Sequence, residues 1–327
     1  MNGGPCLLAV ALMSSVSLAQ SHLDDSAGIL DIGVSDEYSF YPIAEPGQDD
    51  SGRIRFILRS SGEYQFGTSI DRAGDFSVVR AGTGLGFSVP VADRLGIAIG
   101  TSFGYARYDF DRAEVFDGEK PWEHIFTGQA SVIANYALDD TWRLFGGGIL
   151  GFAGEDGAGF SDSVTGGGLF GAGYRHSDDL TVQLGVSVIS QIEDDVAVMP
   201  VLLVDWKIDD QWRLRLGSLD TASGDLVGAG LNYTISERWS VGGRLSWMRS
   251  RFRLDDSGFA PGGVGQDDRF KGTVVVNWRA GDNIDVGVLG GMVFGGELRI
   301  EDENGDRLFK EDYDPTALAG VRLTLRF

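Results

Sequence analysis

The sequence predicts an all-β fold: a transmembrane, antiparallel, up-and-down β-barrel of about 14 strands, although 12 or 16 strands also fit the pattern. Three observations lead to this prediction. Apolar and polar residues alternate with a period of two along most of the chain after residue 53. The connections between these segments alternate between short and long. Tyrosine and tryptophan residues gather next to the short connections.

The composition agrees with a protein made of strands. The chain has 327 residues, of which 49 are glycine and only 8 are proline, and proline is rare in sheets because it removes a ladder donor. It carries 27 Lys and Arg against 48 Asp and Glu, a net charge of -21. Binding to phosphate backbones needs a basic surface. We therefore expect no nucleic-acid partner.

The first 19 residues are predicted to be a signal peptide. The apolar core "CLLAVALM" is followed by the small-residue stretch "SSVSLAQ", and Ser17 and Ala19 suit a cleavage site before Gln20. No Lys or Arg precedes the apolar core, which departs from the usual pattern. Cys6, the only cysteine, lies within this segment. The mature chain would therefore have no thiol chemistry.

Residues 20–52 are predicted to form an acidic periplasmic segment. The segment contains eight acids and no Lys or Arg: Asp24, Asp25, Asp31, Asp36, Glu37, Glu45, Asp49 and Asp50. One interpretation is a solvated tail, and the other is a segment that folds back and partly occludes the basic mouth of the barrel. The stretch "YSFYPIA" within it could instead be one more strand, which would make the strand count odd.

Residues 53–327 are predicted to form the barrel. In the first strand Ile54, Phe56 and Leu58 share one face, while Arg55 and Arg59 share the other. The same alternation predicts half-buried strands at 54–66, 79–89, 95–105, 126–136, 142–152, 164–174, 180–188, 196–206, 212–216, 227–233, 239–247, 270–278, 284–294 and 320–327.

The connections separate the two ends of this barrel. Short polar turns such as "ADR", "DDT", "SDD", "DDQ", "SER" and "GDN" alternate with mostly longer, acidic segments at 109–123, 154–162, 254–268 and 300–316. Outer-membrane barrels have short periplasmic turns and longer extracellular loops. An even strand number places both chain ends on the short-turn side.

Aromatic residues on the apolar face indicate contact with lipid. The predicted membrane-interface aromatics at the short-turn end are Tyr136, Trp142, Tyr174, Trp206, Trp212, Tyr233, Trp239, Trp278 and Phe327. A looser group, including Phe66, Phe103 and Phe294, lies toward the long loops. Exposing such rings to water would cost about 25 cal/mol per Å² of apolar surface. The predicted partners on this face are therefore outer-membrane lipids.

The C-terminal strand carries a resemblance to a known class. Val321, Leu323, Leu325 and Phe327 alternate with polar residues, and the chain ends on the aromatic residue. In this respect the chain resembles outer-membrane β-barrel proteins of Gram-negative bacteria. The stretches "VMPVLLVDWKIDDQWRLRLG" and "DYDPTALAGVRLTLRF" are similar to a bacterial barrel family recorded only as a domain of unknown function. The resemblance implies an outer-membrane location and recognition of the last strand by the barrel-assembly machinery.

The polar face of the strands would then line the lumen, and it is rich in arginine. The candidate lumen-lining residues are Arg53, Arg55, Arg59, Arg143, Arg213, Arg215, Arg244, Arg279, Arg322 and Arg326. One interpretation is structural, since buried guanidinium groups pair with acids and carbonyls. The other is a constriction that favours anions, because a ring of arginines focuses its field inside a low-dielectric wall.

The sequence predicts no catalytic, cofactor or metal site. "GGGILG" (146–151) and "GGGLFG" (166–171) fit a dinucleotide motif, but each lies inside a predicted strand, where glycine more often permits curvature or close packing. His124 is near a long loop, without a lipase or deacylase motif around it. The loop with Asp302, Asn304 and Asp306 resembles the start of a calcium site, but Arg307 and Tyr313 occupy positions that require Gly and Glu.

Two functions follow from this sequence. The first is a passive pore or small-solute transporter with a basic lumen, whose partners would be small anionic solutes. The second is a closed barrel with a structural or adhesive role, acting through its acidic extracellular loops. Conductance across a bilayer separates the two.

Overall fold

The computed structural model describes residues 55–71, 73–111, 116, 120–217 and 225–327. The predicted signal peptide at 1–19 and the acidic segment at 20–52 lie outside the described residues. Where the chain is described, no helix is long and apolar enough to cross a bilayer.

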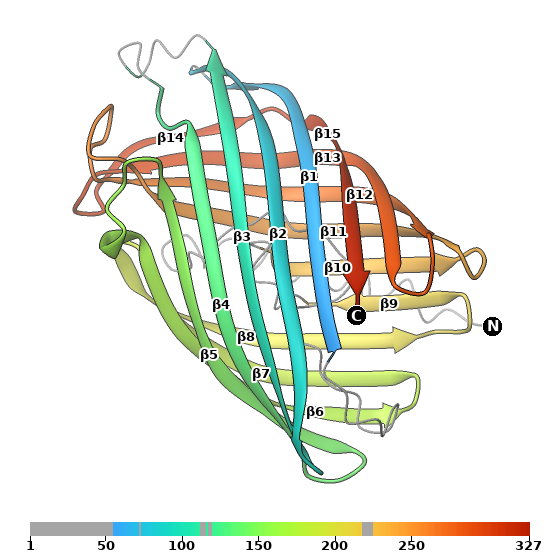
Figure 1. Ribbon diagram of the computed structural model, residues 1–327. Helices are drawn as coiled ribbons and strands as arrows, with labels where there is room; N and C mark the ends of the chain where they lie inside the picture. Colours follow the sequence, from blue (N-terminus) through green and yellow to red (C-terminus); the bar gives the residue numbers. More distant parts are fainter. Residues whose placement is uncertain (1–54, 72, 112–115, 117–119, 218–224) are drawn as a thin grey trace, which may run out of the picture.

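The described chain forms a closed, antiparallel β-barrel of 14 strands, as predicted (Figure 1). The strands are β1 (Arg55–Ile70), β2 (Gly74–Ala92), β3 (Leu95–Asp111), β4 (His124–Ala137), β5 (Trp142–Glu155), β6 (Val164–Ser177), β7 (Leu180–Gln191), β8 (Asp194–Lys207), β9 (Trp212–Leu216), β10 (Asp225–Thr234), β11 (Trp239–Arg253), β12 (Val264–Arg279), β13 (Ile284–Glu301), β14 (Arg307–Tyr313) and β15 (Thr316–Arg326). A short 3₁₀ turn, η2 (Ser161–Ser163), precedes β6.

β14 and β15 together make one barrel strand that is interrupted at Asp314 and Pro315. Both pieces lie between the same neighbours, because each pairs with β13 on one side and with β1 on the other. Proline has no backbone N–H to donate, which explains a break at this point. This accounts for 15 segments in a wall of 14 strands.

The last strand closes the barrel against the first. β1 pairs with β15 from Ile57 opposite Arg326 to Gln65 opposite Leu318. Phe56 and Phe327 exchange two backbone hydrogen bonds, with N···O distances of 3.1 and 2.9 Å. Closure gives the terminal strand a partner on both edges, as hydrocarbon requires of every backbone group. The chain therefore enters and leaves the wall at the end with the short turns, on the lower right in Figure 1.

Side chains alternate between the two faces of the wall. On β2, Val79 and Leu85 are exposed, whereas Val78 and Arg80, on either side of Val79 in the sequence, are buried. The exposed face is apolar over most strands, with Phe103, Leu184 and Val288 all more than half exposed. In water this band would be costly, and in a bilayer it contacts acyl chains.

β5 and β6 contain glycines at which the neighbouring strand lies too close for any side chain. A Cβ on Gly147 would lie 2.0 Å from the carbonyl oxygen of Val132, and one on Gly167 would lie 2.3 Å from that of Val188. These glycines belong to the two dinucleotide-like motifs. Their role is close approach of neighbouring strands, in agreement with the structural interpretation of the sequence.

The strands at the long-loop end extend further than the sequence indicates. The predicted loop at 254–268 includes the start of β12 at Val264, and the predicted loop at 300–316 includes β14. In β12 alternation fails because both faces of the strand end are buried: residues 264–269 are all buried. The strand β9 is short, with only five residues.

Candidate functional site in the barrel interior

The predicted interface aromatics lie on the outside of the wall at the short-turn end. Tyr136, Trp142, Tyr174, Trp206, Trp212, Trp239, Trp278 and Phe327 are between 37 and 72 % exposed, and Tyr233 is half-buried. Trp142 packs against Tyr174, Trp212 against Tyr233, and Trp239 against Trp278, with ring centroids 4.7 to 6.3 Å apart. Pairs of amphipathic rings at one height suit a lipid–water interface.

Three of the predicted lumen-lining arginines are buried on the opposite face. Arg59 on β1, Arg143 on β5 and Arg322 on β15 are each at most 7 % exposed. Because the outer face of each strand is exposed, a buried side chain of the wall at this height points inward. We call these residues the three interior arginines. Nε of Arg322 donates to Oδ1 of Asn277 on β12, a neutral acceptor, at 3.0 Å.

The remaining candidates are less buried. Arg213, Arg215, Arg244 and Arg326 are half-buried, and Arg279 is exposed at the periplasmic rim. Arg53 lies outside the described residues, and the side chain of Arg55 is not among those described.

Two carboxylates form ion pairs with the half-buried and exposed arginines of this group. Asp205 accepts two hydrogen bonds from Arg213, at 2.6 and 2.7 Å, and lies 3.5 Å from Arg215. Asp285 accepts one hydrogen bond from Arg326 and one, at 3.4 Å, from Arg279. Among the described residues of the periplasmic half, arginines outnumber acids on the inner face.

An apolar patch shares the inner face with these arginines. Ile133, Phe145, Ile149, Leu169, Val201 and Leu203 form one buried cluster on β4, β5, β6 and β8. The alternation of the sequence predicts the inner face as polar throughout and therefore missed this patch. Its members lie on the polar parity, between residues such as Ser131, Arg143 and Gly147.

The outer end of the interior is filled by a second apolar core. Phe76, Tyr108, Trp122, Phe252 and Ile300 are at most 2 % exposed and belong to a single cluster. The cluster joins β2, β3 and the loop before β4 to β11, β12, β13 and β14 across the barrel. The rings of Trp122 and Phe252 meet at 5.2 Å between centroids, and those of Phe76 and Tyr313 at 5.0 Å. We call this contact the outer closure.

Asp267 on β12 lies at the polar centre of the outer closure and is fully buried. It accepts hydrogen bonds from Tyr108 on β3 at 2.7 Å and from Tyr313 on β14 at 2.9 Å. Its carboxylate also binds Arg80 on β2 at 3.2 Å and Arg269 at 2.7 Å. One carboxylate thus ties strands on two sides of the barrel to one another.

A second ion pair lies beside this centre. Glu63 on β1 accepts from Lys271 at 2.6 Å and lies 3.8 Å from Arg80, which also donates to Gln65 at 2.9 Å. These groups are all nearly buried. Polar side chains at this depth are stable because each charge has a partner of opposite sign.

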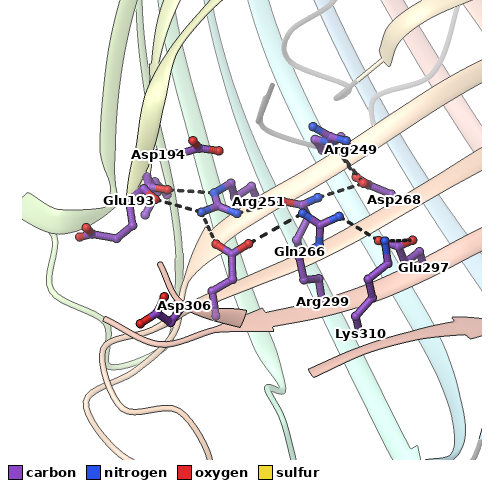
Figure 2. A network of polar contacts seen from close by, with 12 residues as sticks. Glu193, Asp194, Arg249, Arg251, Gln266, Asp268, Glu297, Arg299, Asp306 and Lys310 are labelled. Atoms are coloured by element: carbon purple, nitrogen blue, oxygen red, sulfur yellow. Dashed lines mark hydrogen bonds and ion pairs between the residues drawn. The ribbon is translucent and has the colours of Figure 1, made fainter. Parts of the chain in front are cut away.

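The outer ends of β11, β12 and β13 also carry a polar network, on the face opposite to the one with Phe252 and Asp267 (Figure 2). Arg251 donates to the carbonyl oxygen of Ile192 at 2.8 Å, to Gln266 at 3.0 Å and to Glu301 at 2.5 Å. Arg253 pairs with Glu193, and Arg249 pairs with Asp268 at 2.9 Å. Ile192 and Glu193 form the turn between β7 and β8. This network therefore fixes the tips of β7 and β8 onto the outer closure.

Glu155, at the end of β5, joins two outer loops. Its carboxylate accepts the backbone N–H of Glu123 at 2.7 Å and that of Asp255 at 3.3 Å. Glu155 lies 13 residues from Trp142 along β5, which is roughly 30 Å along the barrel axis at the usual strand rise and tilt. It therefore lies beyond the ~25 Å apolar band of a membrane barrel. Burial raises the pKa of Glu155 to about 7, and the neighbouring Asp255 and Glu123 act in the same direction, against the two N–H donors.

We expect these loops to be held more tightly in acid than in base. The folded pKa lies above the value of about 4.5 for the unfolded chain, so the stabilisation is full below pH 4.5 and is lost as pH rises through 7. After allowance for partial exposure, the loss is about 2 kcal/mol. Thermal unfolding in detergent at pH 5 and pH 8 measures it. The Glu155→Gln variant is the control, and an equal pH dependence in both proteins would contradict the assignment.

The other candidates of the sequence have structural partners. His124 is half-buried and accepts or donates a 2.8 Å hydrogen bond with the hydroxyl of Tyr105. Asp302 accepts the backbone N–H groups of Asn304 and Asp306 at 2.8 and 2.9 Å and so caps its own turn. Among the described residues, no group of three or more His, Cys, Asp or Glu side chains could hold a metal ion.

Comparison with solved structures gives the fold class. The chain is similar to a FadL homologue of Pseudomonas aeruginosa, with a TM-score of 0.50 and 9 % identity over 91 % of this chain and 99 % of that one. It also matches an outer membrane channel from Pseudomonas putida F1, with a TM-score of 0.44 and 10 % identity over 87 % and 98 % of the two chains. No protein-family model matches the chain, and no curated protein sequence does. The fold is that of bacterial outer-membrane β-barrels, and with its exposed apolar band it places the chain in the outer membrane.

Proposed function

We propose that this barrel is a gated channel for small anionic solutes. The observation that carries the proposal is the burial of Arg59, Arg143 and Arg322 on the inner face of its periplasmic half. Cationic side chains that line a pore lower the energy of an anion and raise that of a cation. The low dielectric of the surrounding wall strengthens this preference.

The outer closure makes the channel gated rather than permanently open. Side chains from β2, β3, β11 and β12 fill the outer end, so a solute crosses only when this packing separates. The closure is held by packing and by a few buried charged groups around Asp267, which favours an all-or-none separation over gradual opening. We therefore propose a pore that opens when this packing separates, where the sequence predicts a passive pore.

Single-channel recording in a salt gradient tests the proposal. We expect the wild-type protein to open briefly and to prefer Cl⁻ over K⁺. In the triple variant Arg59→Gln, Arg143→Gln, Arg322→Gln the ratio of Cl⁻ to K⁺ permeability falls about fivefold, because the positive field inside is lost. Arg94→Gln, Lys207→Gln, Arg238→Gln is the matched control, since it removes the same charge from exposed positions at the same end.

A closed barrel with an adhesive or structural role is the second candidate. The filled outer end favours it, because a barrel that never conducts needs no open state. Its acidic outer loops and strand ends, with Asp156, Asp162, Asp194, Asp195 and Asp256, would then carry the function. If no variant, including those that weaken the outer closure, ever conducts, the channel proposal fails and this candidate stands.

A further inference from the structure

A small cavity lies inside the barrel beside the outer closure, where β2, β3 and β4 face β11. We propose that this cavity binds a single monatomic anion such as chloride and that the bound anion holds the outer closure shut. The binding itself is independent of conduction. Only its consequence, a lower open probability, rests on the proposed function.

The lining of the cavity consists of hydrogen-bond donors and apolar groups. Arg80 on β2, Thr127 on β4 and Ser250 on β11 line it, and each is at most 7 % exposed. Ile125 and Phe252 add apolar surface. Among the described residues, no Asp or Glu lines the cavity. Such a wall suits an anion, because it can donate hydrogen bonds and brings no carboxylate that would repel a negative charge.

Arg80 has a buried N–H group that lacks an acceptor. Its Nη1 donates to Gln65 at 2.9 Å, and its Nη2 donates to Asp267 at 3.2 Å. Within the described part of the chain, its Nε has no hydrogen-bond partner. A buried donor without an acceptor is unfavourable, and most so on a charged group. Because Arg80 lines the cavity, an anion bound there is the acceptor that this group lacks.

The buried charges around Arg80 sum to a positive value. Three cations and two carboxylates form this centre among the described residues: Arg80, Arg269, Lys271, Glu63 and Asp267. Each of the five is at most 7 % exposed. A buried net charge is costly, and one monovalent anion brings the sum to zero. A water molecule would accept a hydrogen bond from Arg80 but would leave the charge uncompensated.

The size of the cavity restricts the ligand to a single atom. The cavity has room for about one water-sized sphere. Chloride and bromide ions are only slightly larger than a water molecule. Phosphate, sulfate and organic carboxylates are too large, because each contains several heavy atoms. The ligand class is therefore a halide.

The position of the cavity couples the anion to the outer closure. Its walls come from strands that are not neighbours in the sheet, β2–β4 on one side and β11 on the other. The complete site therefore exists only while these strands are packed together. A ligand that binds one state and not the other stabilises the state it binds. The anion thus favours the closed barrel.

The temperature of the heat-dependent gel shift, measured on the mature protein in detergent, tests the binding. Sodium chloride replaces sodium gluconate at constant ionic strength, since gluconate is too large for the cavity. For the wild type we expect this temperature to rise by at least about 3 °C between roughly 1 and 300 mM chloride and then to saturate. Sodium bromide should act in the same way. Equal temperatures in chloride and gluconate would overturn the proposal.

Two double variants separate the cavity from a general salt effect. Thr127→Val, Ser250→Ala removes two hydroxyl donors without changing any charge. We expect it to raise the chloride concentration for half of the effect at least about tenfold. Thr273→Val, Ser131→Ala is the matched control, because it makes the same changes at buried positions of β12 and β4 that do not line the cavity. Equal chloride dependence of the wild type and the cavity variant would also overturn the proposal.

Single-channel recording distinguishes this inference from the proposed function. At constant ionic strength we expect the open probability of the wild type to fall as chloride replaces gluconate, and that of the cavity variant to respond less. A chloride effect on the gel shift without any conductance would leave the binding intact while the proposed function failed. Anion-selective conductance with a gel shift that is independent of chloride would overturn the binding and leave the proposed function intact.

Discussion

Replacing Asp267 with Asn is expected to weaken the outer closure by about 3–5 kcal/mol, as removal of one member of a buried ion pair does. The carboxylate is shared by Arg80 and Arg269, and both guanidinium groups are nearly buried. The neutral amide keeps the shape of the side chain but not its charge. We expect the temperature of the gel-mobility shift to fall and the open probability in planar bilayers to rise at least tenfold.

Tyr313→Phe is the matched control for this change. It removes one neutral donor to the same carboxylate, at 2.9 Å, and leaves all charges in place. Its cost is about 1 kcal/mol, the usual value for one hydrogen bond. Equal stability and equal conductance of Asp267→Asn and the wild type would show that Asp267 does not hold the closure.

Gly147→Ala is expected to prevent a large part of the chain from reaching the folded barrel. The added methyl group would lie 2.0 Å from the carbonyl oxygen of Val132 and 2.8 Å from Cα of Ile133, and both are backbone atoms of β4. The backbone must move to relieve such contacts, at a cost of about 3 kcal/mol. The folded fraction in isolated outer membranes, measured by the heat-dependent gel shift, reports the loss.

Gly148→Ala, one residue further, provides the comparison. There the nearest atom to an added Cβ is the carbonyl oxygen of Gly167 at 3.9 Å, an ordinary van der Waals contact. We expect this variant to assemble as the wild type does. A similar folded fraction for both alanine variants would mean that β4 and β5 can separate without cost.

The lipid-facing side of the barrel could be predicted from the sequence because lipid imposes one requirement on every strand. Val79, Leu85 and Phe103 lie on that face because hydrocarbon accepts apolar side chains and rejects others. The closing strand followed from the same argument, applied to Val321, Leu323 and Leu325. The close approach of strands at Gly147 and Gly167 was also expected, because both glycine-rich motifs lie inside predicted strands, where glycine permits close packing.

The outer closure could not be predicted in this way. Phe76 and Tyr108 lie on the inward-facing, otherwise polar parity of their strands. Large rings fit at these positions because they pack in one cluster with Phe252 and Tyr313 across the barrel. The ion pair of Asp267 with Arg80 joins residues 187 positions apart. Such contacts depend on how the wall bends, and alternation within one strand contains no information about this. The burial of both faces of β12 near Val264 concealed the strand for the same reason.

The shortness of β9 gives the wall a mechanical line of weakness. In the described residues, β8 and β9 are matched at four positions and β9 and β10 at five, whereas β2 and β3 are matched at 17. Resistance to shear grows with the number of backbone bonds that must break together. A lateral force on the barrel would therefore separate the strands first at β9. The two hydrogen bonds from Arg213 on β9 to Asp205 on β8 add a side-chain link between these two strands.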